Sequence, residues 1–329
     1  MDIFGALDQG LTAAFGEQAM YFAIAAIGLN IHYGYTGLLN FGQAGFMAVG
    51  AYGMAITVTW GNQSMWLGIV VGLLAALVLA LILGIPTLRL RADYLAIVTI
   101  AAAEIIRFVV RAAALRDFSG GSGGLQDYSG AFFDLNPYGT REYTFWFFNY
   151  RGIDLWVMTV GWSLVLLLVF GTYLLTHSPW GRVLKGVRED EDAVRALGKN
   201  AYGFKMQSLI LGGLIGAVGG MMFALAAGSV QPDLYGTATT FFLFTALILG
   251  GAGRVWGPVL GSMLFWFLIQ FTDVALRDMV ARGTMPESIM SGVQVGQFRF
   301  ILVGLGLILL MVFRPQGILG DRRELALDD

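Results

Sequence analysis

Cysteine is absent from this sequence of 329 residues, and histidine occurs only twice. The absence of cysteine excludes disulfides, thiolate metal sites and thiol catalysis, and two histidines leave little material for a histidine metal site. Charged residues are also scarce, at 13% of the chain against about 25% in globular proteins. So few polar side chains cannot cover an ordinary soluble protein, and that class is excluded.

Long apolar runs take the place of the missing charge. Hydrophobic residues make up 57% of the chain, and the mean hydropathy is +0.71. Runs of about 18–25 such residues recur, which is long enough to cross a bilayer. The 46 glycines permit close helix packing and broken helices. The sequence therefore predicts an all-α polytopic membrane protein, with residues 1–329 forming a single transmembrane domain.

We expect about nine membrane segments, within a range of about eight to ten. They are residues 18–35, 41–60, 66–88, 94–115, 154–176, 206–228, 237–253, 256–274 and 296–313. Short glycine-rich breaks separate the first segment from the second and the seventh from the eighth. The sequence leaves open whether either pair consists of half-helices or forms a re-entrant pair.

The distribution of lysine and arginine predicts the orientation in the membrane. With the N-terminus outside and the C-terminus in the cytoplasm, twelve of these residues are cytoplasmic and five are external. The twelve are Arg89, Arg91, Arg182, Lys185, Arg188, Arg195, Lys199, Lys205, Arg254, Arg314, Arg322 and Arg323, and the five are Arg116, Arg141, Arg151, Arg277 and Arg282. This orientation makes residues 116–153 and 275–295 external loops and residues 177–205 a cytoplasmic loop.

The cytoplasmic loop contains the densest charge in the chain, in the stretch "GRVLKGVREDEDAVRALGKN" (181–200). Four acids, Glu189 to Asp192, are expected in the first turn of a short helix, and Arg195 and Lys199 at its last turn, where the helix dipole favours each sign. Gly198 is placed to end the helix in a left-handed conformation. Four consecutive acids suit a protein partner better than an anionic membrane surface, although a solvated connector remains open.

This chain has no sequence signature for hydrolysing ATP. A P-loop requires Gly-x-x-x-x-Gly-Lys-Ser/Thr, and its nearest relative here, "GGAGRVWG", lacks the Lys-Ser/Thr. Any ATP-driven process would therefore take its energy from another chain.

Two sets of residues are candidates for a translocation path. In "GYTGLLNFGQAGFMAVGAYG" (34–53), amides stand among glycines, as a midplane site for a small zwitterion would require; the candidates are Asn40, Gly42, Gln43 and Gly45. Glu104 and Arg107 lie three residues apart in the fourth segment, and ionisable residues within a membrane are functional candidates. Close helix packing and an internal ion pair are the respective structural alternatives.

The external run "FSGGSGGLQ" contains Gly120, Gly121, Gly123 and Gly124. These glycines are candidates for an external gate or for part of a surface that docks an outside partner. A flexible connector is the alternative.

Five stretches, in order, resemble the permeases of branched-chain amino acid ABC importers (the LivM/LivH-like family), and the LivM-like branch more closely. They are "GLNIHYGYTGLLNFGQAGFMAVGAY", "GGSGGL", "GRVLKGVREDEDAVRALGKNAYGFK", "ALILGGAGRVWGPVLGS" and "FRPQGILG". Within the third stretch, Asp192-Ala193-Val194, three further residues and Gly198 are similar to the Glu-Ala-Ala…Gly coupling motif of importer permeases.

The resemblance implies a transport subunit rather than an enzyme, in the cell membrane of a prokaryote. Its implied partners are a second homologous permease in a heterodimer, two cytoplasmic ABC ATPases that use ATP and magnesium, and an extracytoplasmic binding protein. No cofactor is expected on this chain, and no nucleic acid as a partner. The resemblance assigns coupling to the ATPases to Arg188, Glu189, Asp190, Glu191, Asp192, Arg195 and Gly198.

The substrate stays open at this point. Branched-chain amino acids are commonest in the family, and urea or amides also occur. A stand-alone secondary transporter or channel is the alternative from another class, but Glu104 is the only deep acid available for ion coupling. A membrane enzyme would need a clustered nucleophile or metal set, and no such His/Asp cluster is evident.

Overall fold

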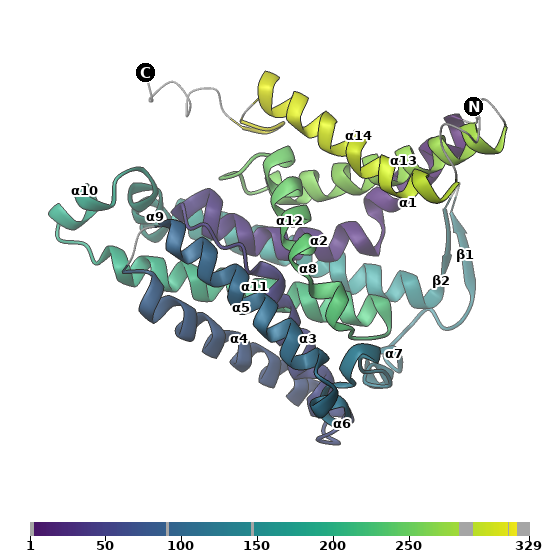
Figure 1. The fold of residues 1–329 in the computed structure, drawn as a ribbon, viewed down its shortest axis with the longest axis horizontal. Helices are drawn as coiled ribbons and strands as arrows, with labels where there is room; N and C mark the ends of the chain where they lie inside the picture. The colour runs from purple at the N-terminus through teal and green to yellow at the C-terminus, as the bar shows by residue number, and fades with distance from the viewer. Residues whose placement is uncertain (1–2, 90–91, 146–147, 283–291, 315, 321–329) are drawn as a thin grey trace.

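The computed structural model describes residues 3–89, 92–145, 148–282, 292–314 and 316–320. Its longer helices are α1 (Ile3–Phe15), α2 (Glu17–Leu29), α3 (Gln43–Thr59), α4 (Met65–Thr87), α5 (Ala92–Arg111), α8 (Gly152–His177), α9 (Pro179–Glu189), α11 (Ala201–Ala227), α12 (Thr237–Gly250), α13 (Gly257–Ala281) and α14 (Gly292–Phe313). The π-helix η1 (Asn30–Tyr35) continues α2, and α10 (Glu191–Ala196) follows α9. The helices pack into a bundle whose long members run side by side (Figure 1).

Each of the nine predicted segments coincides with a helix, but the number of spans is not confirmed. Among the described residues, five helices are long and apolar enough to cross a membrane, namely α4, α8, α11, α13 and the Val295–Phe313 part of α14. The 13 residues of α2 continue through the six of η1, whereas α3 has 17 residues and α12 has 14. The length of α12 is below the roughly 17–25 residues of a membrane span. Although α5 has 20 residues, it carries several charges.

The bundle packs around α11, which contacts α2, α3 and α4. Gly28 of α2 and Gly212 of α11 face each other so closely that a Cβ on either would overlap a backbone oxygen of the other. Small residues at such crossings let membrane helices gain van der Waals contact along their backbones. The high glycine content therefore serves close packing at the centre of the bundle.

The predicted external loop 116–153 is folded and contains the only strands among the described residues. The short helix η2 (Ala113–Leu115) precedes it, and the loop holds α6 (Arg116–Ser119), η3 (Gly121–Gly123) and α7 (Gly130–Phe133), then a hairpin of β1 (Glu142–Phe145) and β2 (Phe148–Arg151). In β1–β2, Glu142 pairs with Arg151 and Tyr143 with Tyr150 in antiparallel register. This hairpin is a small departure from the all-α prediction.

The predicted cytoplasmic and external loops lie at opposite ends of the bundle. Figure 1 shows α9 and α10 at one end and the β1–β2 hairpin with α6 and α7 at the other. Part of the second predicted external loop, residues 283–291, lies outside the described residues.

Candidate functional site

The charged stretch 181–200 forms two helices, and the prediction of one helix beginning at Glu189 is wrong. Glu189 is the last residue of α9, and Asp190 is the N-cap of α10. The Asp190 carboxylate accepts hydrogen bonds from the backbone N–H groups of Asp192 (2.9 Å) and Ala193 (3.0 Å). Because an N-cap needs extended backbone, the chain breaks its helix at this residue. Gly198 has the predicted left-handed conformation, with φ of +74°.

Glu191 fastens α10 to the body of the protein. Its carboxylate accepts from Arg195 within α10 at 2.6 Å and also pairs with the ammonium group of Lys205 on α11. The Glu191 side chain is only 26% exposed and that of Lys205 13%. This pair therefore holds α10 in a fixed position on the start of α11.

Arg188 makes a longer connection, from α9 into the bundle. Its Nη1 donates a 2.6 Å hydrogen bond to the carbonyl oxygen of Gly34 in η1. The same side chain lies against Gly37, and a Cβ on Gly253 would be 3.2 Å from its Nη1. Arg188 thus joins the cytoplasmic loop to both glycine-rich breaks of the chain.

Several other side chains of the stretch point outward, whereas Leu184, Val187 and Val194 are buried. The side chain of Asp192 is 91% exposed and that of Glu189 71%, and Leu197 is 79% exposed as a residue. Leu197 thus presents an apolar side chain to the surroundings between charged residues. We call Glu189, Asp192, Ala196, Leu197 and Lys199 the outward face of α9–α10.

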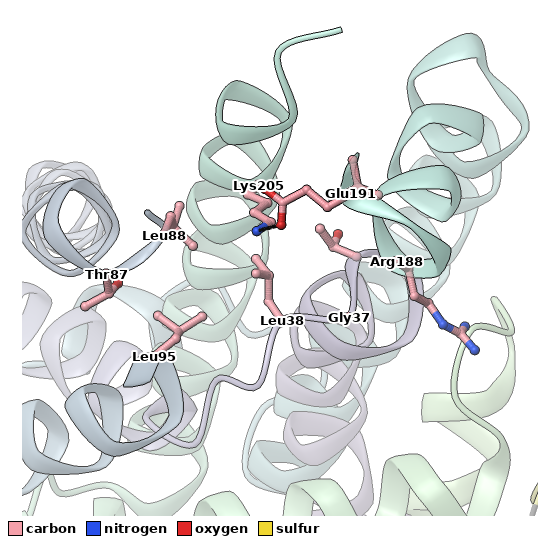
Figure 2. A pocket seen from close by; sticks show the side chains of 10 residues that line it. Gly37, Leu38, Thr87, Leu88, Leu95, Arg188, Glu191 and Lys205 are labelled. Atoms are coloured by element: carbon pink, nitrogen blue, oxygen red, sulfur yellow. Dashed lines mark hydrogen bonds and ion pairs between the residues drawn. The ribbon is translucent and has the colours of Figure 1, made fainter. Parts of the chain in front are cut away.

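A pocket of about 270 Å³ separates α9 and α10 from the membrane helices. Its lining residues are Thr36, Gly37, Leu38, Thr87, Leu88, Leu95, Val187, Arg188, Glu191 and Lys205. Figure 2 shows Glu191 and Lys205 directed toward each other, while the side chain of Arg188 points away from this pair.

The two glycine-rich breaks meet at Asn30, a residue that the sequence interpretation did not select. Its side-chain amide donates to the Arg254 carbonyl and accepts from the Gly253 N–H, both at 2.8 Å. A buried amide satisfies irregular backbone that lipid could not. The one signal in the sequence was a polar residue at the end of an apolar segment.

Asn40 and Gln43 lie in a closed polar network at the centre of the bundle. The Asn40 amide donates to Nδ1 of His32 and to Oε1 of Gln43, both at 3.1 Å. Gln43 donates to the carbonyls of Ala25 and Gly212, and Nε2 of His32 lies 3.1 Å from the Leu209 carbonyl. These three side chains are fully buried. In this conformation they join α2, η1, α3 and α11.

Gly42 and Gly45 lie where α3 begins beside α5. A Cβ on Gly42 would overlap the carbonyl of Thr99, and one on Gly45 would be 3.0 Å from Ala103. Both glycines therefore make the close contacts of the packing alternative, and any role in translocation stays a prediction.

Glu104 and Arg107 pair as predicted and belong to a larger ion cluster. The Arg107 guanidinium lies 2.8 Å from the Glu104 carboxylate and 2.9 Å from that of Asp233 in η4 (Pro232–Tyr235). Arg111 reaches the same Asp233 oxygen at 3.0 Å, and Glu104 also accepts from the backbone and hydroxyl of Thr237. We call Glu104, Arg107, Arg111 and Asp233 the ion cluster; it lies apart from the Asn40–Gln43 network.

The external glycines form a tight turn that packs against the membrane helices. Gly120, Gly121 and Gly124 have positive φ values, whereas a Cβ on Gly123 would meet nothing within 4 Å. Just after the turn, Leu125 and Val230 exchange backbone hydrogen bonds of 3.0 and 2.9 Å. A Cβ on Gly124 would overlap the Val230 carbonyl. The turn is therefore attached to the connection between α11 and α12.

Comparison with known proteins identifies the class of this chain. Residues 12–311 match the family described as branched-chain amino acid transport system, permease component. The chain belongs to this family, and it is a multi-pass membrane protein of the transport-permease type. Among the described residues, no group of three or more His, Asp or Glu side chains is arranged to hold a metal ion.

Two relatives illustrate the similarity. The chain is 29% identical to the high-affinity branched-chain amino acid transport system permease protein LivM of Escherichia coli (strain K12), over 91% of this chain and 68% of the relative. It is 25% identical to the probable branched-chain amino acid transport permease protein LivM of Methanocaldococcus jannaschii, over 91% of this chain and 90% of that relative. The similarity thus extends along nearly all of the sequence.

A more distant relative is the autoinducer 2 import system permease protein LsrC of Escherichia coli O157:H7. It is 29% identical over 124 residues, which is 36% of this chain.

Proposed function

We propose that this chain is the membrane subunit of an ATP-driven ABC importer that moves branched-chain amino acids, leucine, isoleucine and valine, into the cell by alternating access. Membership of the permease family and the names of the relatives along 91% of the chain support the substrate class. ATP and magnesium act in two separate ATPase chains, and this chain carries no cofactor of its own. A second homologous permease and an external binding protein complete the importer.

In this proposal residues 1–329 form a single membrane domain with its N-terminus outside and its C-terminus in the cytoplasm. The external loop 116–153 then faces the binding protein, and the loop 177–205 faces the ATPases. The separation of α9–α10 from the β1–β2 hairpin along the bundle is compatible with this orientation (Figure 1). In this orientation the basic residues around α9 and α10 are cytoplasmic, as the positive-inside rule requires.

The proposal rests on one observation, which is that some side chains of residues 188–198 bond to the rest of the chain while others are exposed. Arg188, Asp190 and Glu191 make contacts within the chain, whereas Asp192 and Leu197 point outward. Because α10 is anchored to α11 and also has a small charged and apolar outward face, it is suited to bind an ATPase chain and to transmit that chain's movement to the bundle. Arg195 and Gly198 shape α10 itself, through the Glu191 pair and the left-handed turn.

The test is assembly and uptake with Asp192→Lys and Leu197→Ser. Both substitutions leave the Glu191–Lys205 pair and the Arg188–Gly34 hydrogen bond in place. Asp192→Lys also removes the exposed 3.3 Å pair between Asp192 and Arg195, which contributes little at a surface, so the fold of α9–α10 should survive. We expect the ATPase chains to co-purify at a yield about tenfold lower, since an apolar anchor and a charge pair are each worth about 1 kcal/mol or more at an interface. Leucine uptake into proteoliposomes should fall in parallel.

Asp134→Lys is the matched control, because Asp134 is exposed in the predicted external loop and undergoes the same change of charge. It should leave co-purification of the ATPases unchanged. If Asp192→Lys and Leu197→Ser also leave both assembly and uptake unchanged, the outward face is only a connector and the proposed coupling is wrong.

A further inference from the structure

The ion cluster lies on α5 and η4, and from its length of 20 residues we expect α5 to cross the membrane. With a rise of 1.5 Å per residue, Glu104 is about 4 Å and Arg107 about 8 Å beyond the midpoint of α5. Both distances are less than half of the roughly 30 Å hydrocarbon core. Charged side chains at such depth are costly when they face lipid, and they mark protein contacts or aqueous cavities.

The chain's own elements do not cover this cluster. The side chain of Asp233 is 59% exposed and that of Arg111 44%, while Arg107 and Glu104 retain 17% and 27%. The open side of the cluster is therefore turned away from the bundle. Since lipid is excluded by cost, either water or another protein chain must lie there.

Exposed apolar side chains occur on the same elements as the charges. They include Ile97, Ile105 and Phe108 on α5 and Phe241 on α12. The Arg107 guanidinium lies 4.6 Å from the centre of the Phe108 ring. Charges of both signs next to apolar side chains complement a zwitterion with a hydrocarbon side chain.

We propose that the face formed by α5, η4 and the start of α12 lines a water-filled part of the solute path, where the ion cluster recognises a zwitterionic amino acid. The guanidinium of Arg107 receives the solute's carboxylate, and the carboxylates of Glu104 and Asp233 receive its ammonium group. The water-filled face stands without the proposed function; only the identity of the solute rests on it.

An exchange of ion-pair partners explains how the zwitterion could bind without leaving Arg107, Glu104 or Asp233 unpaired. In the structure, Arg107 bridges Glu104 and Asp233. When a zwitterion arrives, each broken ion pair is replaced by one of the same type, so no charge loses its partner. The fixed hydrogen bonds from Thr237 keep Glu104 in place while its other oxygen changes partners.

Thiol labelling tests the water-filled face directly, because the natural chain contains no cysteine. Ala101, one turn before Glu104, and Ala238, next to Thr237, are both exposed. In the assembled complex in native membranes, Ala101→Cys and Ala238→Cys are treated with a membrane-impermeant methanethiosulfonate reagent. The matched control is Leu166→Cys, at a position that is 57% exposed near the middle of the apolar helix α8.

We expect both test positions to react at least about tenfold faster than Leu166→Cys, since thiolate forms in water and not in lipid. If they react as slowly as Leu166→Cys, the face is covered by lipid or protein and the proposal is overturned. Rapid cross-linking of Ala101→Cys to the second permease, without reagent access, would have the same consequence.

Substitution of Arg107 tests the recognition step. Arg107→Gln should raise the leucine concentration for half-maximal uptake about tenfold, as expected for the loss of one charge-assisted pair. Arg107→Lys keeps the charge and should restore part of the affinity. Arg282→Gln is the control because it removes an exposed ion pair with Asp278 elsewhere. An unchanged half-maximal concentration in Arg107→Gln would overturn the recognition role.

The two proposals can fail separately. If the unmodified complex shows no ATP-driven leucine uptake, the proposed function is wrong, yet the labelling of Ala101→Cys still reports whether this face is wet. If uptake is normal but labelling is absent, the proposed function stands and the path lies elsewhere.

Discussion

Arg188 on α9 donates its Nη1 hydrogen to the carbonyl oxygen of Gly34 at 2.6 Å, which joins the charged loop 177–205 to the π-helix η1. η1 is in turn tied to the second glycine-rich break, because Asn30 bonds Gly253 and Arg254. A displacement of α9 would therefore reach both breaks through one guanidinium. Wide π-turns are common at functional sites, where they permit local rearrangement.

The first prediction concerns this link. Arg188→Gln should leave the outward face of α9–α10 intact but weaken its connection to η1, so ATP hydrolysis continues while leucine uptake falls several-fold. The ratio of leucine transported to ATP hydrolysed, measured in proteoliposomes, is the readout. Arg182→Gln, an exposed site on the same helix, serves as control. A normal ratio in Arg188→Gln would show that force passes by another contact.

The second prediction concerns Asn30. Asn30→Leu leaves the Gly253 N–H and the Arg254 carbonyl without their amide partner, at a cost of about 1–3 kcal/mol for a buried unsatisfied group. We expect a lower Tm in detergent, with Gln63→Leu, in an exposed turn, as the unaffected control. Equal Tm values for the two variants would mean that the two breaks are not held together by this amide.

The third prediction concerns close packing between α2 and α11. Gly28→Ala places a methyl group against the Gly212 backbone, and overpacking of this kind costs about 1–3 kcal/mol. Gly171→Ala on α8 adds the same atom in open space and should be neutral or slightly stabilising. Thermal unfolding of the two purified variants measures the difference, and equal stability would show that the helices separate easily.

The fourth prediction concerns the anchoring of α10. Glu191→Lys breaks the pair with Lys205 and brings like charges together, so α10 should detach more often and trypsin should cut after Arg195 several times faster. Adding Lys205→Glu restores the pair with reversed signs and should slow cleavage again, although incompletely because Arg195 then faces a positive charge at position 191. A cleavage rate unaffected by either change would place the anchor elsewhere.

The helical segments themselves were predictable, because each apolar run is flanked by glycine, proline or charge. The helix boundaries within residues 181–200 could not be predicted from the sequence, because Asp190 is equally suitable as an acid in the first turn of a helix and as an N-cap. The hydrogen bonds from Asp192 and Ala193 decide for the N-cap. The number of spans was also beyond the sequence, because short helices such as α12 reach their places only through packing against α13 and α2.

The sequence by itself determined that this chain belongs in a membrane, that it has no P-loop of its own and that its charge is concentrated in one loop. Composition and periodicity depend on residues that are close together in the chain, so they can be recognised from the sequence alone. Only the tertiary structure decided that Arg188 reaches Gly34 and that Asn30 bonds Gly253, 223 residues further along the chain. It also decided that Glu104 belongs to an ion cluster with Asp233, which Arg107 bridges, and not to the Asn40–Gln43 network. These relations depend on which helix faces which, and that is set by the close approach of backbones at glycines far apart in the chain.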